Sequence, residues 1–423
     1  MNGNNNIKLR LIILSWLQFA IWGSYLTSMG RYLTEIGLGD NIGWFYSVQG
    51  IVSIFMPAFI GIVADRWIQA QKLLSICHGM SALLMGYLGY VGFNLNEAIQ
   101  FSDLFPIYAI AVAFYMPTIA LTYSVSYSAL KKFNLDTIKS FPPIRLFGTV
   151  GFIVSMWIVD IFGFQQTPAQ FYVCAVWGIL MSIYSLTMPK CPTGSCSDNK
   201  SLASSLGLDA FKLFKVPHMA VFFIFSMFLG VSLQITNGYA NPFISSFENI
   251  EEYKGLFFVE HANILISLSQ VSETLCILLI PFFLKRYGIK TVMLIAMFAW
   301  VLRFALFDLG TPTWPGILCL IMSMVVYGVA FDFFNISGSL FVDNETDSNI
   351  RSSAQGLFMM MTNGFGAAIG TLSAQTIVNK FVFSQTSAEA IHHGWETCWL
   401  IFSAYALLVG LLFSILFKVP KKL

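Results

Sequence analysis

The chain has 423 residues, of which 57% are hydrophobic and only 10% carry a charged side chain. Soluble domains are about 45–50% apolar and about 25% charged, so this composition excludes a water-soluble globular protein and predicts a membrane protein. A net charge of +2 at pH 7, without any basic cluster, gives no indication of nucleic-acid binding.

Apolar runs long enough to cross a membrane recur along the whole chain. The hydrocarbon core of a bilayer is about 30 Å thick and takes about 20 helical residues. These runs must be helices, because an open strand in lipid leaves its backbone groups without hydrogen bonds. The twelve predicted spans lie at 9–30, 43–63, 72–92, 104–130, 144–164, 168–188, 217–240, 258–284, 289–309, 314–341, 351–378 and 393–418.

The connections between the runs predict the domain organisation. The first run is too long for the apolar region of a signal peptide, so we expect a first spanning helix. The longest connection, 189–216, is polar and divides the spans six and six. We therefore expect an N-terminal six-helix bundle over 1–188, a cytosolic central loop over 189–216 and a C-terminal six-helix bundle over 217–423.

Lys and Arg are distributed unevenly between the predicted loops. With the N-terminus inside, the cytosolic segments hold 18 of the 23 Lys and Arg residues, the outer segments three and the spans two. Cytoplasmic loops carry an excess of Lys and Arg, so both termini are expected in the cytosol. This distribution also favours an even number of spans.

A short motif follows the second span. Gly61-Ile-Val-Ala-Asp65-Arg66 stands there, and Lys285-Arg286 stands at the equivalent point of the second half. The first copy resembles the G-x-x-x-D-R signature of the major facilitator superfamily, which implies two pseudo-symmetric six-helix bundles, an all-α membrane fold. Asp65 and Arg66 would then form a conformational latch by pairing with nearby charges and helix ends. The alternative is a plain positively charged cytosolic loop.

Two carboxylates lie near the middle of predicted spans, Glu273 and Asp332. Charged groups at mid-bilayer cost at least a few kcal/mol and are functional by default. Polar and aromatic side chains recur at helical spacing in four spans, and these faces must turn onto a wet cavity. They are Arg145, Thr149 and Phe152; Gln234 and Asn237; Gln270 with Glu273; and Tyr327, Phe331 and Asn335 beside Asp332.

Simpler interpretations of these residues remain open. Amides in spans often only join helices through hydrogen bonds, and aromatic residues at helical spacing are more often packing. Arg303, near the outer end of its span, is expected to extend to the interface, and Arg145 can do the same at the cytosolic edge. The five His residues, among them His78, are expected at span edges and in loops.

Several segments together resemble the bacterial nucleoside:proton symporter family. They are Phe141-Pro-Pro-Ile-Arg145-Leu-Phe-Gly-Thr149, Leu233-Gln234-Ile-Thr-Asn237, Ser269-Gln270-Val-Ser-Glu273, Tyr327-Gly-Val-Ala-Phe331-Asp332 and Met360-Met-Thr-Asn-Gly-Phe-Gly. The resemblance implies a proton-driven importer of purine and pyrimidine nucleosides, such as uridine and adenosine, in the bacterial inner membrane. It implies that Asp332 is tied to proton coupling, with Glu273 a second candidate, and that the nucleoside is bound by Arg145, Thr149, Phe152, Gln234, Asn237, Gln270, Glu273, Tyr327 and Phe331.

One departure from the expected pattern lies in the fourth span, where Tyr123 replaces a smaller polar residue. The rival function is a proton-coupled transporter of sugars or other small polar solutes with the same fold. A membrane-embedded enzyme would need a nucleophile, a metal set or a His–acid group, and no such catalytic pattern is present in the sequence. We therefore expect no enzyme activity, cofactor or metal, and a transporter that works as a monomer in the lipid bilayer.

Overall fold

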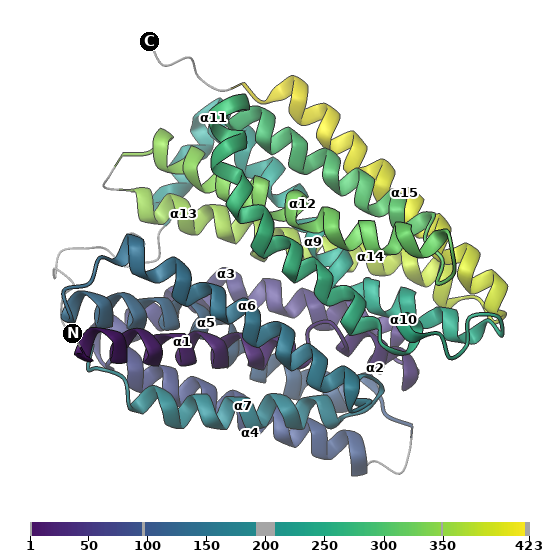
Figure 1. Ribbon diagram of the computed structural model, residues 1–423, viewed down its shortest axis with the longest axis horizontal. Coiled ribbons are helices and arrows are strands. Elements are labelled where there is room, and N and C mark those ends of the chain that lie inside the picture. The colour runs from purple at the N-terminus through teal and green to yellow at the C-terminus, as the bar shows by residue number, and fades with distance from the viewer. Residues whose placement is uncertain (1, 95–97, 192–207, 348–349, 419–423) are drawn as a thin grey trace. The chain divides into compact units, whose positions relative to one another are not determined.

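The computed structural model describes residues 2–94, 98–191, 208–347 and 350–418. The chain forms two compact units: unit 1 holds Met1–Leu38 and Val52–Leu206, and unit 2 holds Gly39–Ile51 and Gly207–Leu423. Both are built of helices (Figure 1). The domain boundaries expected from the sequence remain a prediction.

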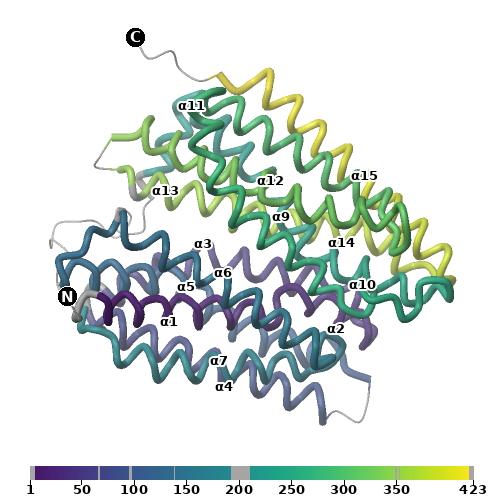
Figure 2. Tube along the Cα trace, in the orientation of Figure 1, coloured from purple at the N-terminus to yellow at the C-terminus, as the bar shows by residue number. Residues whose placement is uncertain are grey.

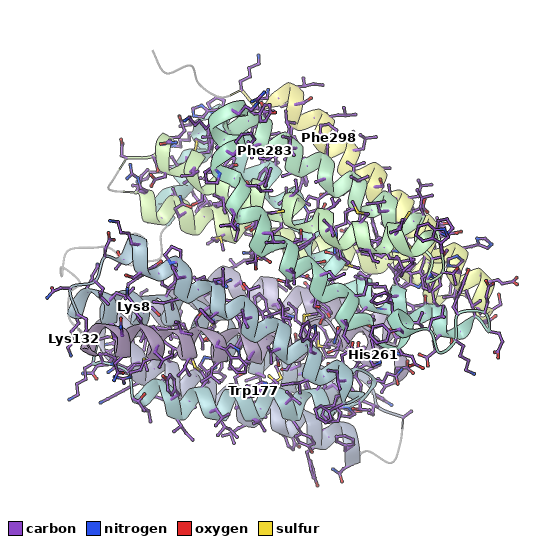
Figure 3. All side chains as sticks on the ribbon, viewed as in Figure 1. Lys8, Lys132, Trp177, His261, Phe283 and Phe298 are labelled. Carbon is purple, nitrogen blue, oxygen red and sulfur yellow. The ribbon has the colours of Figure 1, made fainter. Side chains whose placement is uncertain are left out.

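Unit 1 is a bundle of long helices. Helices α1, α4, α5, α6 and α7 run side by side in it (Figure 1). Lys8 in α1 and Lys132 at the end of α5 lie at the same end of this bundle (Figure 3). The elements are α1 (Asn2–Gly23), α2 (Met29–Glu35), α3 (Ile42–Arg66) from Val52 onward, α4 (Ala70–Asn94), α5 (Phe101–Lys132), α6 (Thr137–Ile161), η2 (Phe164–Gln166) and α7 (Ala169–Leu186).

Unit 2 contains the first turns of α3 and the rest of the chain. Its centre is aromatic: Trp300, Trp395 and Trp399 are fully buried. The elements are η1 (Gly39–Asn41), η3 (Leu208–Lys215), α9 (Pro217–Ser246), η4 (Phe247–Asn249), α10 (Phe257–Glu260), α11 (Ala262–Asp308), α12 (Gly316–Glu345), α13 (Arg351–Met359), η5 (Met360–Gly366), α14 (Ala367–Val378), η6 (Asn379–Phe383) and α15 (Ala388–Leu416).

Ten helical segments of the described chain are long and apolar enough to cross a membrane. One of them, α11, has 47 residues, which at 1.5 Å per residue is about twice the thickness of a bilayer core. Gly288 interrupts it with φ 76° and ψ 167°, a conformation that is essentially restricted to glycine. Figure 2 traces α11 as two arms that meet at this turn.

The first and the eleventh predicted spans differ in local structure from the helices observed. The first, 9–30, is not one helix, because α1 ends at Gly23 and α2 begins only at Met29. The Ser24 hydroxyl donates to the Ile21 carbonyl at 2.7 Å and so competes for a backbone acceptor at the helix end. The eleventh contains a π-helical segment, Met360–Gly366; such segments are rare and frequent at functional sites.

A polar cluster lies inside the apolar bundle of unit 1. The Gln18 amide donates to Thr118 Oγ1 at 2.9 Å, and its carbonyl oxygen accepts from Thr122 Oγ1 at 2.7 Å. His78 Nε2 lies 2.9 Å from the same oxygen. His78 is fully buried inside unit 1; its expected place near a span edge stays a prediction. The cluster joins α1, α4 and α5 through hydrogen bonds that lipid does not offer.

Candidate functional site

Arg145 organises a polar surface of unit 1. Its Nε donates to the Tyr123 hydroxyl at 2.8 Å, and its Nη1 lies 3.5 Å from Thr149 Oγ1. The guanidinium lies over the Phe19 ring, 3.9 Å from the ring centroid. Three helices, α1, α5 and α6, therefore hold the cation in place. It remains half-buried, so its remaining donors are accessible to a ligand.

Thr149 and Phe152 follow Arg145 along α6. Thr149 is half-buried, as Arg145 is. Phe152 is buried and meets the Trp22 ring edge-on, with ring centroids 6.4 Å apart. Phe152 is thus mainly a packing contact between α1 and α6 in this structure, whereas Thr149 and Arg145 present polar groups.

In unit 2, α9 presents the two amides expected from the sequence. Asn237 Nδ2 donates to Gln234 Oε1 at 3.3 Å, as residues three apart on a helix can do. Both side chains are half-buried, whereas their neighbours in sequence are buried. The amides therefore occupy the accessible edge of a helix that is otherwise in the core.

Tyr327 in α12 is the centre of a second cluster in unit 2. Its ring stacks on Phe331, with centroids 5.8 Å apart and an interplanar angle of 14°. Gln270 lies within hydrogen-bonding reach of the Tyr327 hydroxyl, and both Glu273 and Asp332 lie close enough to interact with it electrostatically. The structure thus brings together five of the residues singled out from the sequence, from α11 and α12.

Close packing of two helices positions this cluster. Gly328 lies against the backbone of Ser272, where a Cβ atom would come within 2.6 Å of the Ser272 carbonyl. The Ser272 hydroxyl donates to the Val325 carbonyl. Because Gln270 and Glu273 flank Ser272 in sequence, this approach places them beside the Tyr327 turn of α12.

The expectation that Arg303 extends to the membrane interface is wrong. Arg303 is only 2% exposed, and its Nη1 donates to the Ser323 carbonyl at 2.5 Å and to Ser269 Oγ at 3.4 Å. Its guanidinium lies 4.8 Å from the centroid of the Tyr327 ring. The two arms of α11 fold back on each other, so the arginine points into unit 2 rather than outward. Its position near the outer end of the predicted span had instead indicated a side chain directed toward the membrane interface.

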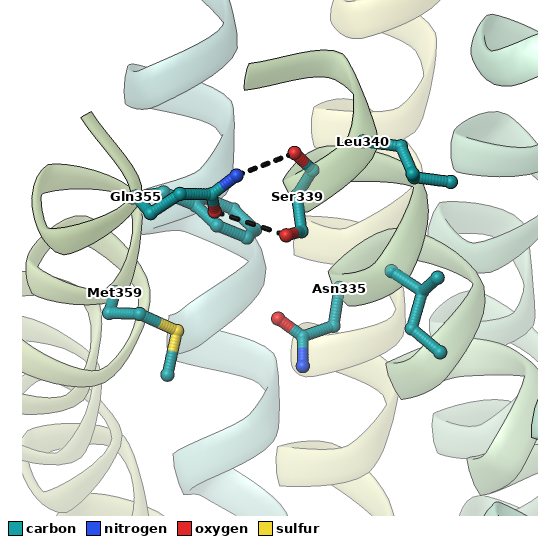
Figure 4. A pocket seen from close by; sticks show the side chains of 7 residues that line it. Asn335, Ser339, Leu340, Gln355 and Met359 are labelled. Carbon is teal, nitrogen blue, oxygen red and sulfur yellow. Dashed lines mark hydrogen bonds between the residues drawn. The ribbon is translucent and has the colours of Figure 1, made fainter. Parts of the chain in front are cut away.

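Asn335 continues the same stripe on α12, one turn after Phe331. It lines a cavity of about 310 Å³ between α12 and α13, shown in Figure 4. There the Gln355 amide donates to the Ser339 carbonyl at 2.7 Å, and the Ser339 hydroxyl donates back to Gln355 Oε1 at 3.1 Å. Nothing in the sequence pattern had singled out Gln355.

The side chains of Asp65 and Arg66, the expected latch, lie outside the described residues. Arg145 and Thr149 belong to unit 1, and the other polar candidates to unit 2. Amides, carboxylates and stacked rings on long apolar helices define a multi-pass membrane protein with polar groups at span depth, as transporters have.

Comparison with known proteins identifies the family. The sequence profile described as "Nucleoside H+ symporter" matches residues 5–422, so the chain belongs to the nucleoside H+ symporter family. It is 45% identical over 415 residues to the nucleoside permease NupG of Escherichia coli K12, covering 98% of this chain and 96% of the relative. It is 47% identical over 415 residues to the xanthosine permease of the same organism, with the same coverage.

The fold agrees with a solved structure. A crystal structure of the nucleoside transporter NupG superimposes with a TM-score of 0.88 at 45% identity, covering 98% of this chain and all of the other. The chain therefore has the major facilitator fold. Its activity is nucleoside–proton symport, that of its family.

Proposed function

We propose that this protein imports purine and pyrimidine nucleosides across the bacterial inner membrane, together with protons, by alternating access. Counting the two arms of α11 separately and adding α1 to the ten candidate spans gives twelve crossings. This number supports two six-helix bundles with both termini in the cytosol. Lys8 and Lys132 at one end of unit 1 (Figure 3) agree with the excess of cations expected on that side.

The observation that carries this proposal is the cluster around Tyr327. Stacked rings can bind the face of a base, and stacking of this kind is worth about 1–3 kcal/mol per base. The Gln270 amide and the Glu273 carboxylate offer acceptors and a donor for base edges or ribose hydroxyls. Tyr327, Phe331, Gln270 and Glu273 are therefore assigned to nucleoside binding.

The remaining candidates supply further polar contacts to the nucleoside. Arg145 keeps donors accessible while Tyr123 and Phe19 hold it. Gln234 and Asn237 can exchange their mutual hydrogen bond for bonds to a ligand. Thr149 and Phe152 are assigned to the same surface, Thr149 by its hydroxyl and Phe152 by its ring.

Asp332 is assigned to proton coupling, with Glu273 as the second candidate. Asp332 is 3% exposed and lies on the helix that carries the stacked rings. Protonation removes a buried charge, which favours closure around the site. A potential of about 100 mV contributes about 2.3 kcal/mol per proton, and one pH unit about 1.4 kcal/mol. Together they support roughly a 500-fold nucleoside gradient for one proton per nucleoside.

The other assignments complete the proposal. Asp65 and Arg66 act as a latch between conformations, and the protein works as a monomer in the lipid bilayer. Its work is transport alone, with no enzymatic step, cofactor or metal. Uridine represents the pyrimidine nucleosides and adenosine the purine nucleosides among the proposed substrates.

Uptake by proteoliposomes tests the proposed substrates. Labelled uridine should accumulate when the outside is more acidic or the inside electrically negative, and not in the absence of both gradients. Unlabelled adenosine should compete with it, whereas glucose should not. The rival function, a sugar transporter of the same fold, predicts the reverse order of competition. Empty liposomes of the same lipid are the control for leak.

A further inference from the structure

Arg303 is a buried cation whose hydrogen-bond partners among the described residues are all neutral. Ser323 and Ser269 accept its hydrogen bonds, and the sulfur of Met324 lies 3.9 Å from Nη2. The Nε has no hydrogen-bond acceptor among the described residues. A guanidinium has five N–H donors, and burying a charge in a membrane protein costs several kcal/mol. Its hydrogen bonds alone therefore do not account for its position.

Two aromatic rings provide further stabilisation of the buried guanidinium charge. The guanidinium lies 4.8 Å from the ring centroid of Tyr327 and 5.1 Å from that of Phe307. Cation–π contacts between desolvated groups are worth up to about 2 kcal/mol. The Trp300 ring also meets Tyr327 edge-on at 6.0 Å, with an interplanar angle of 88°. Arg303 and Trp300 thus fix the Tyr327 ring from the second arm of α11.

The position of this ring decides the geometry of the site. Tyr327 stacks on Phe331 and carries the hydroxyl that Gln270 reaches. A tyrosine free to change rotamer would lose both contacts, and binding would then have to restore them at a cost in free energy.

We propose that Arg303 is a positioning residue of the transport site, holding Tyr327 in the orientation that binds the nucleoside. This role depends on the proposed function, because only there does Tyr327 contact the substrate. It acts on nucleoside affinity through the Tyr327 ring.

Substitution of Arg303 separates this role from a purely structural one. Arg303→Met should raise the KM for uridine about 2- to 30-fold, the loss of one desolvated cation–π contact. The maximal rate per folded molecule should stay within about twofold, since the missing contact is one of binding. Arg303→Lys keeps the cation without the planar fork, so its KM should lie between those of wild type and Arg303→Met.

A double-mutant cycle tests whether the effect passes through the tyrosine ring. In a Tyr327→Phe background the ring remains, and Arg303→Met should still raise KM. In a Tyr327→Leu background the ring is gone, and Arg303→Met should change KM no further. Arg31→Met removes a different buried arginine, 3% exposed and in unit 1, and should leave the KM unchanged.

The outcomes are distinct. If Arg303→Met does not fold, the same cycle with Arg303→Lys gives the answer. If Tyr327→Leu raises the KM but Arg303→Met has the wild-type KM, the positioning role of Arg303 is wrong, whereas the assignment of Tyr327 to the nucleoside site is kept. An unchanged KM in Tyr327→Leu overturns the site, and the role of Arg303 with it. Equal effects of Arg303→Met in the Phe and Leu backgrounds would mean that the arginine acts elsewhere.

Discussion

The contact between Tyr123 and Arg145 joins two helices of unit 1 at a half-buried surface. Arg145 donates to the Tyr123 hydroxyl at 2.8 Å and also stacks on Phe19. A long, charged side chain whose guanidinium is held by two neighbouring helices loses little further entropy when a ligand binds. If Arg145 binds the nucleoside as proposed, Tyr123 contributes to affinity without needing to touch the ligand.

Replacing Tyr123 by Phe removes the acceptor and keeps the ring. Hydrogen bonds to charged groups are worth about 1.5–3 kcal/mol when buried, and the half-buried position lowers this value. We expect uridine to bind about fivefold more weakly, a change of about 1 kcal/mol, by calorimetry of the purified protein. Tyr127→Phe, which alters a ring packed on Phe141 at 4.6 Å, is the control; an equal loss there would contradict the role of Tyr123.

Residue types and helical spacing located most of the polar candidates, but not their partners. Glu273, Gln270 and Tyr327 stood out because polar groups at span depth need an explanation. Arg303 was misplaced because distance from the end of a span does not reveal which face packs inward. Tyr123 had been noticed only as a departure from a pattern, since its partner is 22 residues away in sequence.

At the scale of elements, the approach of α11 to α12 determines where the Tyr327 cluster lies. Gly328 fits against the Ser272 backbone, and the Ser272 hydroxyl bonds to Val325. Lipid offers no hydrophobic drive for this association, so small residues and hydrogen bonds hold the helices together. Any atom added at Gly328 must push the helices apart.

Gly328→Ala should therefore weaken both the fold and the site. The added methyl group would lie 2.6 Å from the Ser272 carbonyl, and overpacking of this kind costs about 1–3 kcal/mol. A lower melting temperature in detergent and a higher KM for uridine are expected. Gly356→Ala is the matched control, because an added Cβ there meets nothing within 4 Å. Wild-type stability and KM in Gly328→Ala would show that the helices can move apart freely.

Apolar runs predicted the positions of most helices well, because the thickness of a bilayer fixes their length. They did not predict the break after Gly23 or the π-helical segment at Met360–Gly366, which depend on local hydrogen bonds. Hydropathy also does not reveal the non-helical conformation of Gly288, which divides α11 into two arms. The division into six and six helices stays a prediction.

Symport of a proton through the whole molecule requires a group that changes its charge during transport, and we assign this role to a carboxylate. A neutral nucleoside gains nothing from the membrane potential, so the co-transported proton must supply the work. Asp332 is buried on α12, the helix that also carries Tyr327 and Phe331. The group proposed to take the proton is thereby on the same rigid element as the proposed nucleoside contacts, which would link the two ligands.

Proton-driven accumulation by Asp332→Asn tests this claim most directly. Asparagine keeps the shape of the side chain and cannot ionise, so coupling should be lost while uridine binding remains measurable. Asp343 lies on the same helix, is half-buried and pairs with Arg351 at 3.1 Å; the Asp343→Asn variant should accumulate uridine as the wild type does. In proteoliposomes with an imposed proton gradient, the account predicts that Asp332→Asn only equilibrates labelled uridine across the membrane; uphill accumulation at the wild-type level would contradict it.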